Sequence, residues 1–317
     1  MTDREKALRQ AARRLLEENT VNLVIGYAWG TLPLRTAPFF ARTPAEADRL
    51  VYNSLCENNL VKYLLRYSKE KLGLVVKGCD ARSLVVLLRE NQVQRDRVHI
   101  IGVPCTGVID RRKVMELVDG QEVTGAEVTV EGIVVRGEGF EKDIKTDEVL
   151  CVSCRGCKYG TPVLYDTLVG EEVRAREENF GDIRAFEALP PSEREAYFAQ
   201  EMAKCIRCYA CRNVCPLCYC TECFVDSSRP QWLSRRPATA DNFFFHLGRA
   251  YHLAGRCVDC GACARACPVG VDLMKLNRKL IKDAKDLFGY EAGLDPGQPS
   301  LLSTFDPNDP ERFILGG

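Results

Sequence analysis

The feature that most constrains this chain is a cysteine run that occurs twice with the same spacing. The first run is Cys205-x-x-Cys208-x-x-Cys211-x-x-x-Cys215-Pro216, and the second is Cys257-x-x-Cys260-x-x-Cys263-x-x-x-Cys267-Pro268. In this pattern three thiolates bind one face of a 4Fe-4S cube, and the fourth reaches across to a second cube. We therefore predict two crossed clusters. One takes Cys205, Cys208, Cys211 and Cys267, and the other takes Cys257, Cys260, Cys263 and Cys215.

Structural zinc is the alternative for these runs, because zinc sites also use paired C-x-x-C motifs. A zinc ion needs only four ligands, which gives no reason for a third cysteine and a C-x-x-x-C-P step, twice. Of the 17 cysteines, 14 lie between Cys151 and Cys267, so the excess is local. Dense cysteines at short, regular spacing indicate metal ligands wherever thiols stay reduced.

The compartment and the charge balance restrict the function classes. Residues 1–20 form a charged amphipathic pattern without an apolar signal region, and the chain has no apolar run long enough to span a membrane. We therefore expect a cytoplasmic protein. Its 44 Lys and Arg balance 44 Asp and Glu, so no net field favours nucleic acid or a membrane surface.

The hydrophobic pattern divides the chain into three parts. Residues 1–150 alternate strand-like runs, at 21–29, 72–76 and 98–103, with helical patterns, which predicts an α/β domain that ends in an antiparallel ribbon. Residues 151–292 predict an α+β, ferredoxin-like iron–sulfur domain with helical insertions at 190–204 and 241–255. Residues 293–317 hold four prolines, and we expect them to extend over a neighbouring surface or a partner subunit.

Nine cysteines remain outside the two runs, and they suggest a third cluster. Cys151-x-x-Cys154-x-x-Cys157 repeats the three-ligand pattern without a local fourth member. Cys79 and Cys105 each follow a predicted strand, in loops that meet at the carboxyl edge of an α/β sheet. We predict a third 4Fe-4S cluster on Cys151, Cys154, Cys157 and one of these two. The alternative is that Cys79 and Cys105 are small buried loop residues.

Another dense group follows the first run. Cys218-Tyr-Cys220-Thr-Glu-Cys223 has the spacing for three corners of a fourth cluster, with the remaining strand-end cysteine as the last corner. Zinc binding, or shielding of the neighbouring cube, is the alternative for this group. We expect Cys56 to be a packed thiol.

Other candidate site residues carry weaker patterns. Gly78, Asp80 and Arg82 place a guanidinium near a helix start, which suggests a loop for a flavin phosphate or another anion. We expect surface or core roles for the three histidines, His99, His246 and His252. Basic residues flank the clusters and either soften their charge, dock an acidic partner or are simply solvated. They are Lys204, Arg207, Arg212, Arg256 and Arg265.

The segment at 75–114 resembles the coenzyme F420 hydrogenase and dehydrogenase beta-subunit family, which includes beta subunits of deazaflavin-linked formate dehydrogenases. The matching motifs are KGCDAR at 77–82 and GVPC-x-G at 102–107. With the cysteine groups, the resemblance covers roughly residues 20–285. It implies an iron–sulfur flavoprotein that passes electrons between a large catalytic subunit and FAD, a deazaflavin or another carrier.

We therefore expect an electron-transfer subunit, active in anaerobic metabolism, within a complex of the formate dehydrogenase, hydrogenase or heterodisulfide-reductase type. No acid–base constellation for substrate chemistry accompanies the cysteines, which favours a relay without catalytic residues of its own. The alternative is a flavin-bearing oxidoreductase subunit that reduces a deazaflavin or a similar carrier. A zinc-rich interaction scaffold is a third hypothesis, and the duplicated run argues against it.

Overall fold

The computed structural model describes residues 2–301 except residues 179 and 235. Its N-terminal half is built on a five-stranded sheet of order β2-β1-β3-β4-β8. β1, β3, β4 and β8 run parallel, and β2 pairs antiparallel with β1. The strands are β1 (Leu23–Trp29), β2 (Thr36–Ala41), β3 (Leu72–Val76), β4 (Val98–Gly102) and β8 (Thr167–Leu168). The strands expected within 21–29, 72–76 and 98–103 are confirmed.

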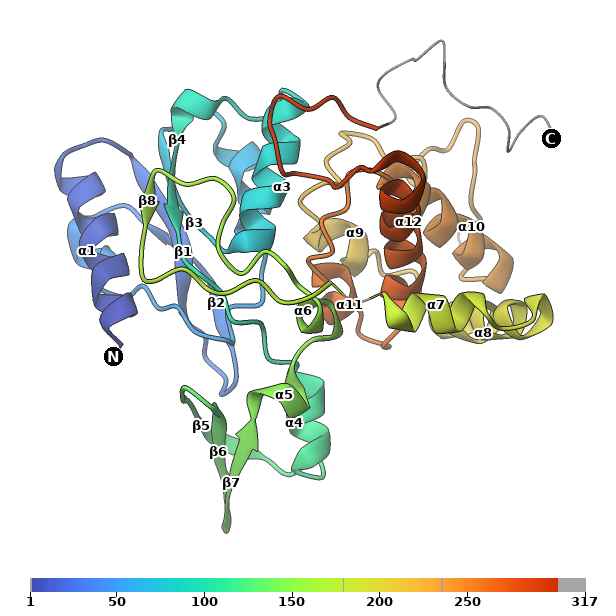
Figure 1. The fold of residues 1–317 in the computed structure, drawn as a ribbon, viewed down its shortest axis with the longest axis horizontal. Helices are drawn as coiled ribbons and strands as arrows, with labels where there is room; N and C mark the ends of the chain where they lie inside the picture. Colours follow the sequence, from blue (N-terminus) through green and yellow to red (C-terminus); the bar gives the residue numbers. More distant parts are fainter. Residues whose placement is uncertain (1, 179, 235, 302–317) are drawn as a thin grey trace.

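Helices cover both faces of this sheet, and α1 and α3 lie on opposite sides of it (Figure 1). Because both faces are covered, β3 is buried along its whole length and reads as a continuous apolar run. The helices of this part are α1 (Asp3–Glu17), α2 (Pro44–Ala47), η1 (Leu60–Tyr67), α3 (Gly78–Arg89) and η2 (Arg95–Arg97). The loops after β3 and β4 leave the same edge of the sheet, which places Cys79 and Cys105 at that edge.

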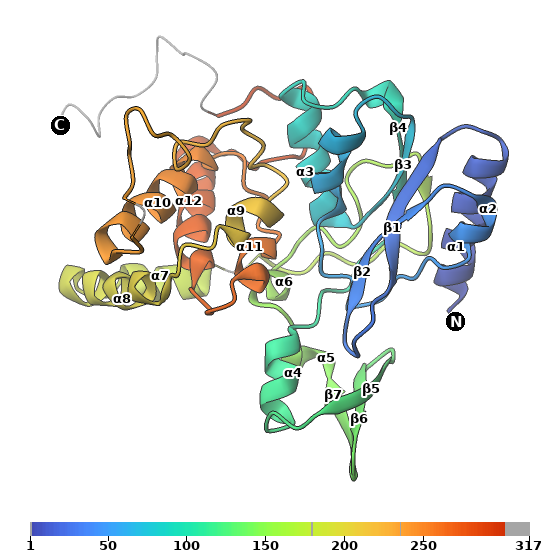
Figure 2. The same ribbon diagram turned by 180° about the vertical axis from the view of Figure 1, so that it is seen from behind.

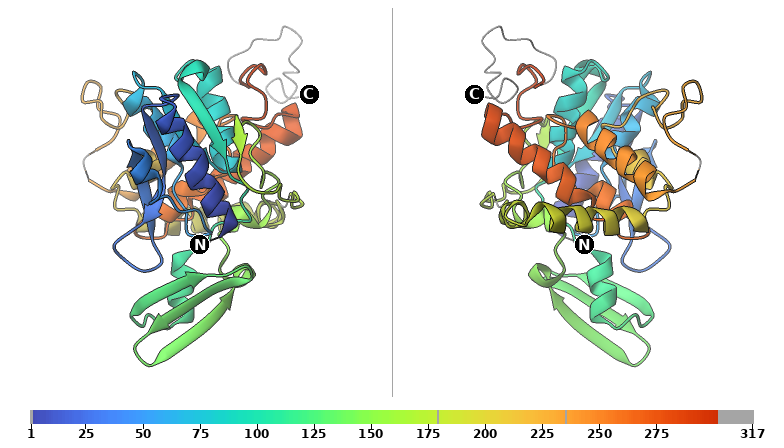
Figure 3. Two further views of the ribbon diagram at one scale, coloured as in Figure 1. Left: turned by 90° about the vertical axis from the view of Figure 1, so that its left-hand side faces the viewer. Right: turned by 90° about the vertical axis from the view of Figure 1, so that its right-hand side faces the viewer.

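A separate small sheet follows, with strand order β5-β6-β7. It consists of β5 (Val123–Val128), β6 (Gly132–Gly137) and β7 (Phe140–Lys145), and it packs with α4 (Arg111–Leu117) and α5 (Thr146–Val149) around its own apolar core. The view from behind and the two side views show it set apart from the other layers (Figures 2 and 3). This sheet is the antiparallel ribbon that the sequence predicts.

The C-terminal half is helical. It contains α6 (Val152–Arg155), α7 (Gly181–Glu187), α8 (Pro191–Lys204), α9 (Ala210–Val214), α10 (Thr239–His252), α11 (Ala262–Ala266) and α12 (Leu273–Phe288). α10 packs against α8 and α12, and α11 packs against α9 and α12. Most cysteines of this half lie in the loops between these helices, and no strand follows Leu168 among the described residues. The fold is thus an α/β domain followed by a helical iron–sulfur region.

The two halves share contacts on both sides of residue 150. The chain returns to the first sheet as β8, which pairs with β4. Residues 292–301 lie against α3, where Arg89 donates a hydrogen bond of 3.3 Å to the Gln298 carbonyl. The expected tail beyond residue 301 lies outside the described residues. Within the described part of the chain, no helix combines the length and the apolar character that a membrane span requires.

Candidate functional site

The two cysteine runs share one backbone conformation. The residues two and four positions after the first cysteine of each run adopt left-handed backbone angles. They are Arg207 (φ 52°), Tyr209 (φ 59°), Asp259 (φ 57°) and Gly261 (φ 67°). A helix of five residues follows in each run, α9 or α11, and the last cysteine continues in an extended conformation. Non-glycine residues rarely adopt left-handed backbone angles. Their repetition at equivalent positions indicates that both runs need the same loop conformation around their cysteines.

Backbone N–H groups of the runs point at cysteine sulfurs. The Arg207 N–H donates to Cys205 Sγ at 3.4 Å, and the Val271 N–H donates to Cys267 Sγ at 3.3 Å. Such donors stabilise thiolates and help set the potential of an iron–sulfur cluster. Burial raises the pKa of Cys211 to about 12, so a metal is needed to hold its thiolate at neutral pH. The donor set therefore fits iron–sulfur ligation.

The packing of α9 against α11 brings the last cysteine of each run toward the other run. Cys205, Cys211, Cys263 and Cys267 belong to one packed group of side chains, whereas Cys215, Cys257 and Cys260 belong to another. Burial raises the pKa of Cys260 to about 12, and the neighbouring Cys215 adds to the rise. Cys267 thus packs with cysteines of the first run and Cys215 with cysteines of the second, as crossed ligation requires, whereas Cys263 packs with the first group, so the crossed ligand sets stay a prediction.

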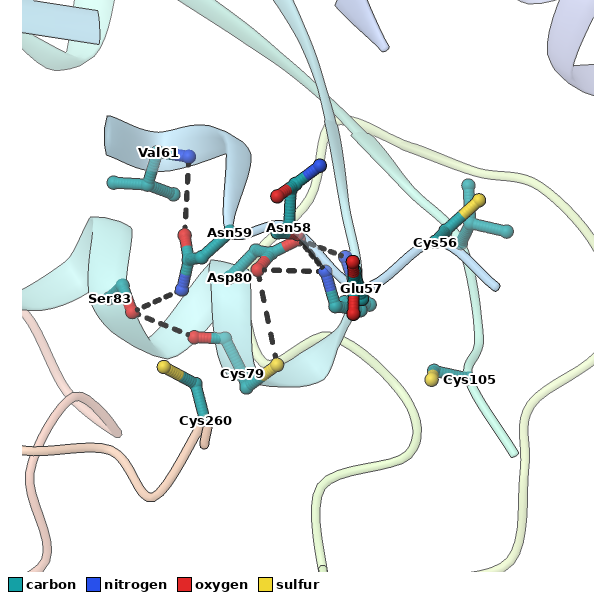
Figure 4. A network of polar contacts seen from close by, with 12 residues as sticks. Cys56, Glu57, Asn58, Asn59, Val61, Cys79, Asp80, Ser83, Cys105 and Cys260 are labelled. Carbon is teal, nitrogen blue, oxygen red and sulfur yellow. Dashed lines mark hydrogen bonds and ion pairs between the residues drawn. The ribbon is translucent and has the colours of Figure 1, made fainter. Parts of the chain in front are cut away.

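A second site lies at the carboxyl edge of the first sheet. Four cysteines of the N-terminal half and the central loop line one cavity of about 90 Å³, together with Cys260 of the second run. The four are Cys79, Cys105, Cys154 and Cys157. We call this space the cysteine cavity. The close view of this edge shows Cys260 near Cys79 at the start of α3 (Figure 4).

Cys151 lies outside the residues that line the cysteine cavity. It precedes α6 as its N-cap residue, is 3% exposed and lies near the Arg265 guanidinium. Cys154 lies within α6 and Cys157 follows its end, and both line the cysteine cavity, whereas Cys151 lies beside Cys154 and Arg265 without lining it. The structure thus groups both strand-end cysteines with Cys154 and Cys157, rather than one of them with all three members of the 151–157 group.

A buried ion pair supports the wall of the cysteine cavity. Lys77 Nζ lies 2.9 Å from Asp80 Oδ2, and the two side chains are 2% and 0% exposed. Lys77 also donates hydrogen bonds to the Tyr27 hydroxyl at 2.7 Å and to the Asn58 carbonyl at 2.5 Å. Because a buried charge is costly unless it is paired, these contacts fix the loop that leads into α3.

The structure places Gly78, Asp80 and Arg82, the predicted flavin or anion loop, in contacts within the protein. A side chain at Gly78 would collide with the Tyr159 carbonyl oxygen, 1.6 Å from a Cβ placed there. The Arg82 guanidinium donates to the Ala292 carbonyl at 2.8 and 3.0 Å and lies over the Tyr159 ring. With Asp80 paired to Lys77, all three residues are occupied by protein contacts, so this loop holds the fold together.

The remaining cysteines fall into two environments. Cys218, Cys220 and Cys223 line a cavity of about 380 Å³ beside α10, which we call the loop cavity. Cys56 is 1% exposed in the α/β core, where a packed thiol was expected. Among the residues that the structure describes, no group of three or more His, Cys, Asp or Glu side chains is arranged to hold a single metal ion.

The largest of these cavities, of about 820 Å³, lies between α4, α11 and the loop at 57–58. Four arginines line it, namely Arg35, Arg111, Arg112 and Arg265, against two acids, Glu57 and Glu116. We call it the arginine cavity. Arg265 joins it to the clusters, because its guanidinium donates to the Cys260 carbonyl at 2.9 Å. The sequence contains no motif that predicts this site, since its arginines come from separate segments.

His246 is a functional candidate that the sequence analysis assigned to a surface or core role. Its Nε2 lies 3.3 Å from Cys205 Sγ, and the residue is 5% exposed. Burial and the nearby Arg249 lower the pKa of His246 to about 4, so its imidazole is neutral at pH 7. His99 instead contacts the Thr167 hydroxyl at 3.1 Å and joins β4 to β8.

The fold and the cysteine geometry define an iron–sulfur redox protein with two linked parts. Comparison with protein families identifies both. Residues 201–271 match the 4Fe-4S dicluster domain, which carries two clusters, and residues 69–181 match the C terminus of the coenzyme F420 hydrogenase/dehydrogenase beta subunit. The chain thus combines a beta-subunit module of that family with a dicluster domain, which confirms the resemblance seen in its motifs.

Two curated relatives extend this similarity over most of the chain. The F420-dependent formate dehydrogenase subunit beta of Methanocaldococcus jannaschii is 24% identical across 91% of this chain and 92% of its own. The F420-dependent formate dehydrogenase 1 subunit beta of Methanococcus maripaludis is 25% identical across 73% of this chain and 75% of its own. Among solved structures, a chain of the F420-reducing [NiFe] hydrogenase complex from Methanosarcina barkeri aligns with 48% of this chain and 58% of its own, at 17% identity and a TM-score of 0.37.

Proposed function

We propose that this chain is the electron-transfer beta subunit of a formate dehydrogenase, hydrogenase or heterodisulfide-reductase type complex. In this role it links a catalytic redox subunit to a flavin, deazaflavin or other carrier. The observation that carries the proposal is the cysteine cavity, where Cys260 of the dicluster run lies with four cysteines of the beta-subunit module. An electron relay requires that its metal sites lie close together, and this cavity brings cysteines of the beta-subunit module and of the dicluster run to one place. The names of the two curated relatives support the choice of complex.

The proposal assigns three ligand sets. The first cluster takes Cys205, Cys208, Cys211 and Cys267, and the second takes Cys215, Cys257, Cys260 and Cys263. For the third, the residues that line the cysteine cavity favour Cys79, Cys105, Cys154 and Cys157. Residues 151–292 then supply ten of these twelve thiolates, and residues 1–150 supply Cys79 and Cys105 at the sheet edge.

Bound 4Fe-4S clusters supply one-electron transfer. The residues of this chain determine the solvent exposure and the charge around the cluster ligands. Cys211, Cys215, Cys263 and Cys267 are each at most 9% exposed, so the helices shield these four thiols from water, whereas Cys208 is exposed. The Arg249 guanidinium is 5% exposed and donates to the Cys211 carbonyl at 3.2 Å. Its positive charge lies among the buried thiols and offsets the negative charge that thiolate ligation brings.

One observation favours a second candidate, in which the chain itself binds the carrier. Flavins and deazaflavins with phosphate-bearing tails are anionic, and four arginines line the arginine cavity beside α11. Guanidinium groups recognise phosphate and carboxylate oxygens through paired hydrogen bonds. This cavity, rather than the loop at Gly78, Asp80 and Arg82, is therefore our candidate flavin site.

The relay proposal is tested by anaerobic purification of the chain, with iron, acid-labile sulfide, zinc and flavin measured per chain. Two clusters require about eight iron atoms and three require about twelve. Reduction should then be followed by absorption and electron paramagnetic resonance (EPR), with the reduced chain mixed with a deazaflavin or flavin acceptor. Iron below about eight per chain in a fully loaded sample, or zinc in its place, would overturn the proposal.

The carrier site is tested by titrating the iron-loaded chain with FAD and, separately, with a deazaflavin. Arg35→Ala and Arg111→Ala should each weaken binding by roughly tenfold, about the effect of one charge-assisted hydrogen bond. Arg14→Ala is the matched control, because Arg14 is exposed and pairs only with Glu18 in the same helix. Equal binding by all four proteins would remove the arginine cavity as the site.

A further inference from the structure

The loop cavity contains more metal-ligating side chains than its three cysteines. Cys218, Cys220 and Cys223 line it from the segment that follows the first run, and His252 lines it from the end of α10. The His252 ring meets the Phe224 ring edge-on, with ring centroids 5.4 Å apart. Soft sulfur ligands and an imidazole nitrogen around one cavity of about 380 Å³ suit an iron–sulfur group.

Several contacts hold the cysteine segment in place. Lys62 Nζ donates to the Cys218 carbonyl at 3.2 Å, and the Tyr219 hydroxyl donates to Glu90 at 2.7 Å. Glu90 also accepts two hydrogen bonds from Arg256, at 2.6 and 2.8 Å. The segment is therefore anchored to the α/β domain at Cys218 and Tyr219. A site built on anchored backbone costs less ordering entropy when a ligand binds.

The charge around the loop cavity favours an anionic occupant. Five cations line it, namely Lys62, Arg66, Arg212, Arg249 and Arg256, against one acid, Asp226. Arg212 is paired with Asp226 at 2.8 Å. Arg249 is 5% exposed, and its Nε has no hydrogen-bond partner among the described residues. A buried N–H donor without a hydrogen-bond partner destabilises the fold. The unpaired Arg249 Nε therefore indicates that a group bound in the cavity interacts with this guanidinium.

The fourth corner of this site cannot come from the N-terminal half. The spacing suggested that a leftover strand-end cysteine, Cys79 or Cys105, would complete it. Both of these residues line the cysteine cavity instead. His252 is the remaining side chain of the loop cavity that commonly ligates iron, and histidine replaces cysteine in some iron–sulfur clusters.

We propose that Cys218, Cys220, Cys223 and His252 bind a further 4Fe-4S cluster in the loop cavity. The Cys218 N–H donates to the Cys215 carbonyl at 3.3 Å, so this cluster would adjoin the one that contains Cys215. The cysteine cavity meets that same cluster at Cys260. Cys220 is exposed, so the loop cavity reaches the surface of the chain. This site is separate from the three ligand sets proposed above.

The test is Cys220→Ser in the anaerobically prepared full chain, with iron, sulfide and zinc measured per chain. We expect a loss of about four iron atoms, with the EPR signals of the other clusters unchanged. Because Cys220 is exposed, the variant should retain the far-ultraviolet circular dichroism spectrum of the unmodified chain. Unchanged iron, loss of zinc instead of iron, or loss of the dicluster signals would each overturn the proposal. Intact dicluster signals with unchanged iron would leave the proposed function standing.

Two substitutions at His252 test the fourth ligand. His252→Cys should keep the iron content and change the EPR spectrum and reduction potential of one cluster, because a thiolate donates more charge than an imidazole. His252→Ala should lower the iron content or alter the same signal. If His252→Ala leaves both iron and spectra unchanged, histidine ligation is refuted. His99→Ala serves as the control, since His99 lies at the junction of β4 and β8.

Discussion

Cys79 and Cys260 line one cavity, although Cys79 begins a helix of the α/β domain and Cys260 belongs to the second ferredoxin-type run. The close view shows the two residues near each other at the edge of the sheet (Figure 4). Arg265 reinforces this junction, because its guanidinium donates to the carbonyls of Cys260 and Glu57. The junction gives the chain a continuous series of thiols from the sheet edge to the helical half, on which the predictions below depend.

Replacement of Cys154 and of Cys151 should have different effects. Cys154→Ala should lower the iron content by about four atoms per chain, because Cys154 lines the cysteine cavity. Cys151→Ala should leave the iron content unchanged, since this thiol packs near Arg265 instead. Iron and sulfide analysis of the two variants, prepared in parallel, measures the difference. Equal iron loss in both would show that the 151–157 group binds as a unit.

The crossed ligation predicts reciprocal effects of two serine substitutions. Cys215→Ser should disturb the cluster held by Cys257, Cys260 and Cys263, because serine is a poor substitute for a thiolate ligand. Cys267→Ser should disturb the cluster held by the first run. EPR spectra of the reduced variants distinguish the two clusters if their potentials differ. Damage confined to the variant's own run in each case would contradict the crossing.

His246 should tune the cluster that contains Cys205. With the proton on Nε2, the neutral imidazole donates a hydrogen bond to Cys205 Sγ across 3.3 Å. Hydrogen bonds to cluster sulfurs stabilise the reduced, more negative state and raise the potential. His246→Phe should therefore lower the potential of that cluster while iron stays constant, as measured by anaerobic redox titration. Asn277→Leu provides a comparison at the other cluster, where the Asn277 amide approaches Cys263 Sγ at 3.7 Å. An unchanged potential in His246→Phe would assign the histidine to packing alone.

Arg82 should contribute to stability rather than to ligand binding. The Arg82 guanidinium donates hydrogen bonds of at most 3.3 Å to the carbonyls of Ala292 and Val258. Arg82→Ala removes these hydrogen bonds. We expect a loss of about 2 to 4 kcal/mol in the free energy of unfolding, measured by anaerobic urea denaturation. Arg14→Ala, at an exposed helical position, should change it by less than about 0.5 kcal/mol. Flavin affinity should be the same in Arg82→Ala and the unmodified chain, and a marked loss would restore the anion-binding role.

The strands, the α/β part and the iron–sulfur part follow from the sequence by local reasoning, whereas the two crossed ligand sets stay a prediction. Buried strands read as apolar runs, and the spacing within each cysteine run determines which thiols lie on one face of a cluster. The repeated left-handed residues, Arg207 and Tyr209 in one run and Asp259 and Gly261 in the other, are the local geometry behind that spacing.

Local patterns do not show the contacts that distant segments make. Gly78, Asp80 and Arg82 have the composition of an anion loop, but Tyr159, Lys77 and the segment after α12 use their contacts. Cys151 shares its spacing with Cys154 and Cys157, but it lies beside Cys154 and Arg265 without lining the cysteine cavity.

By itself, the sequence determined that this chain carries a 4Fe-4S dicluster region beside an α/β domain, because short-range spacing limits which thiolates can reach one cube. Only the tertiary structure decided which distant thiols meet, namely Cys79 and Cys105 with Cys154 and Cys157, and Cys218, Cys220 and Cys223 with His252. The physical reason is that such meetings depend on how the sheet edge packs against the helical half, and no spacing along the chain encodes that packing.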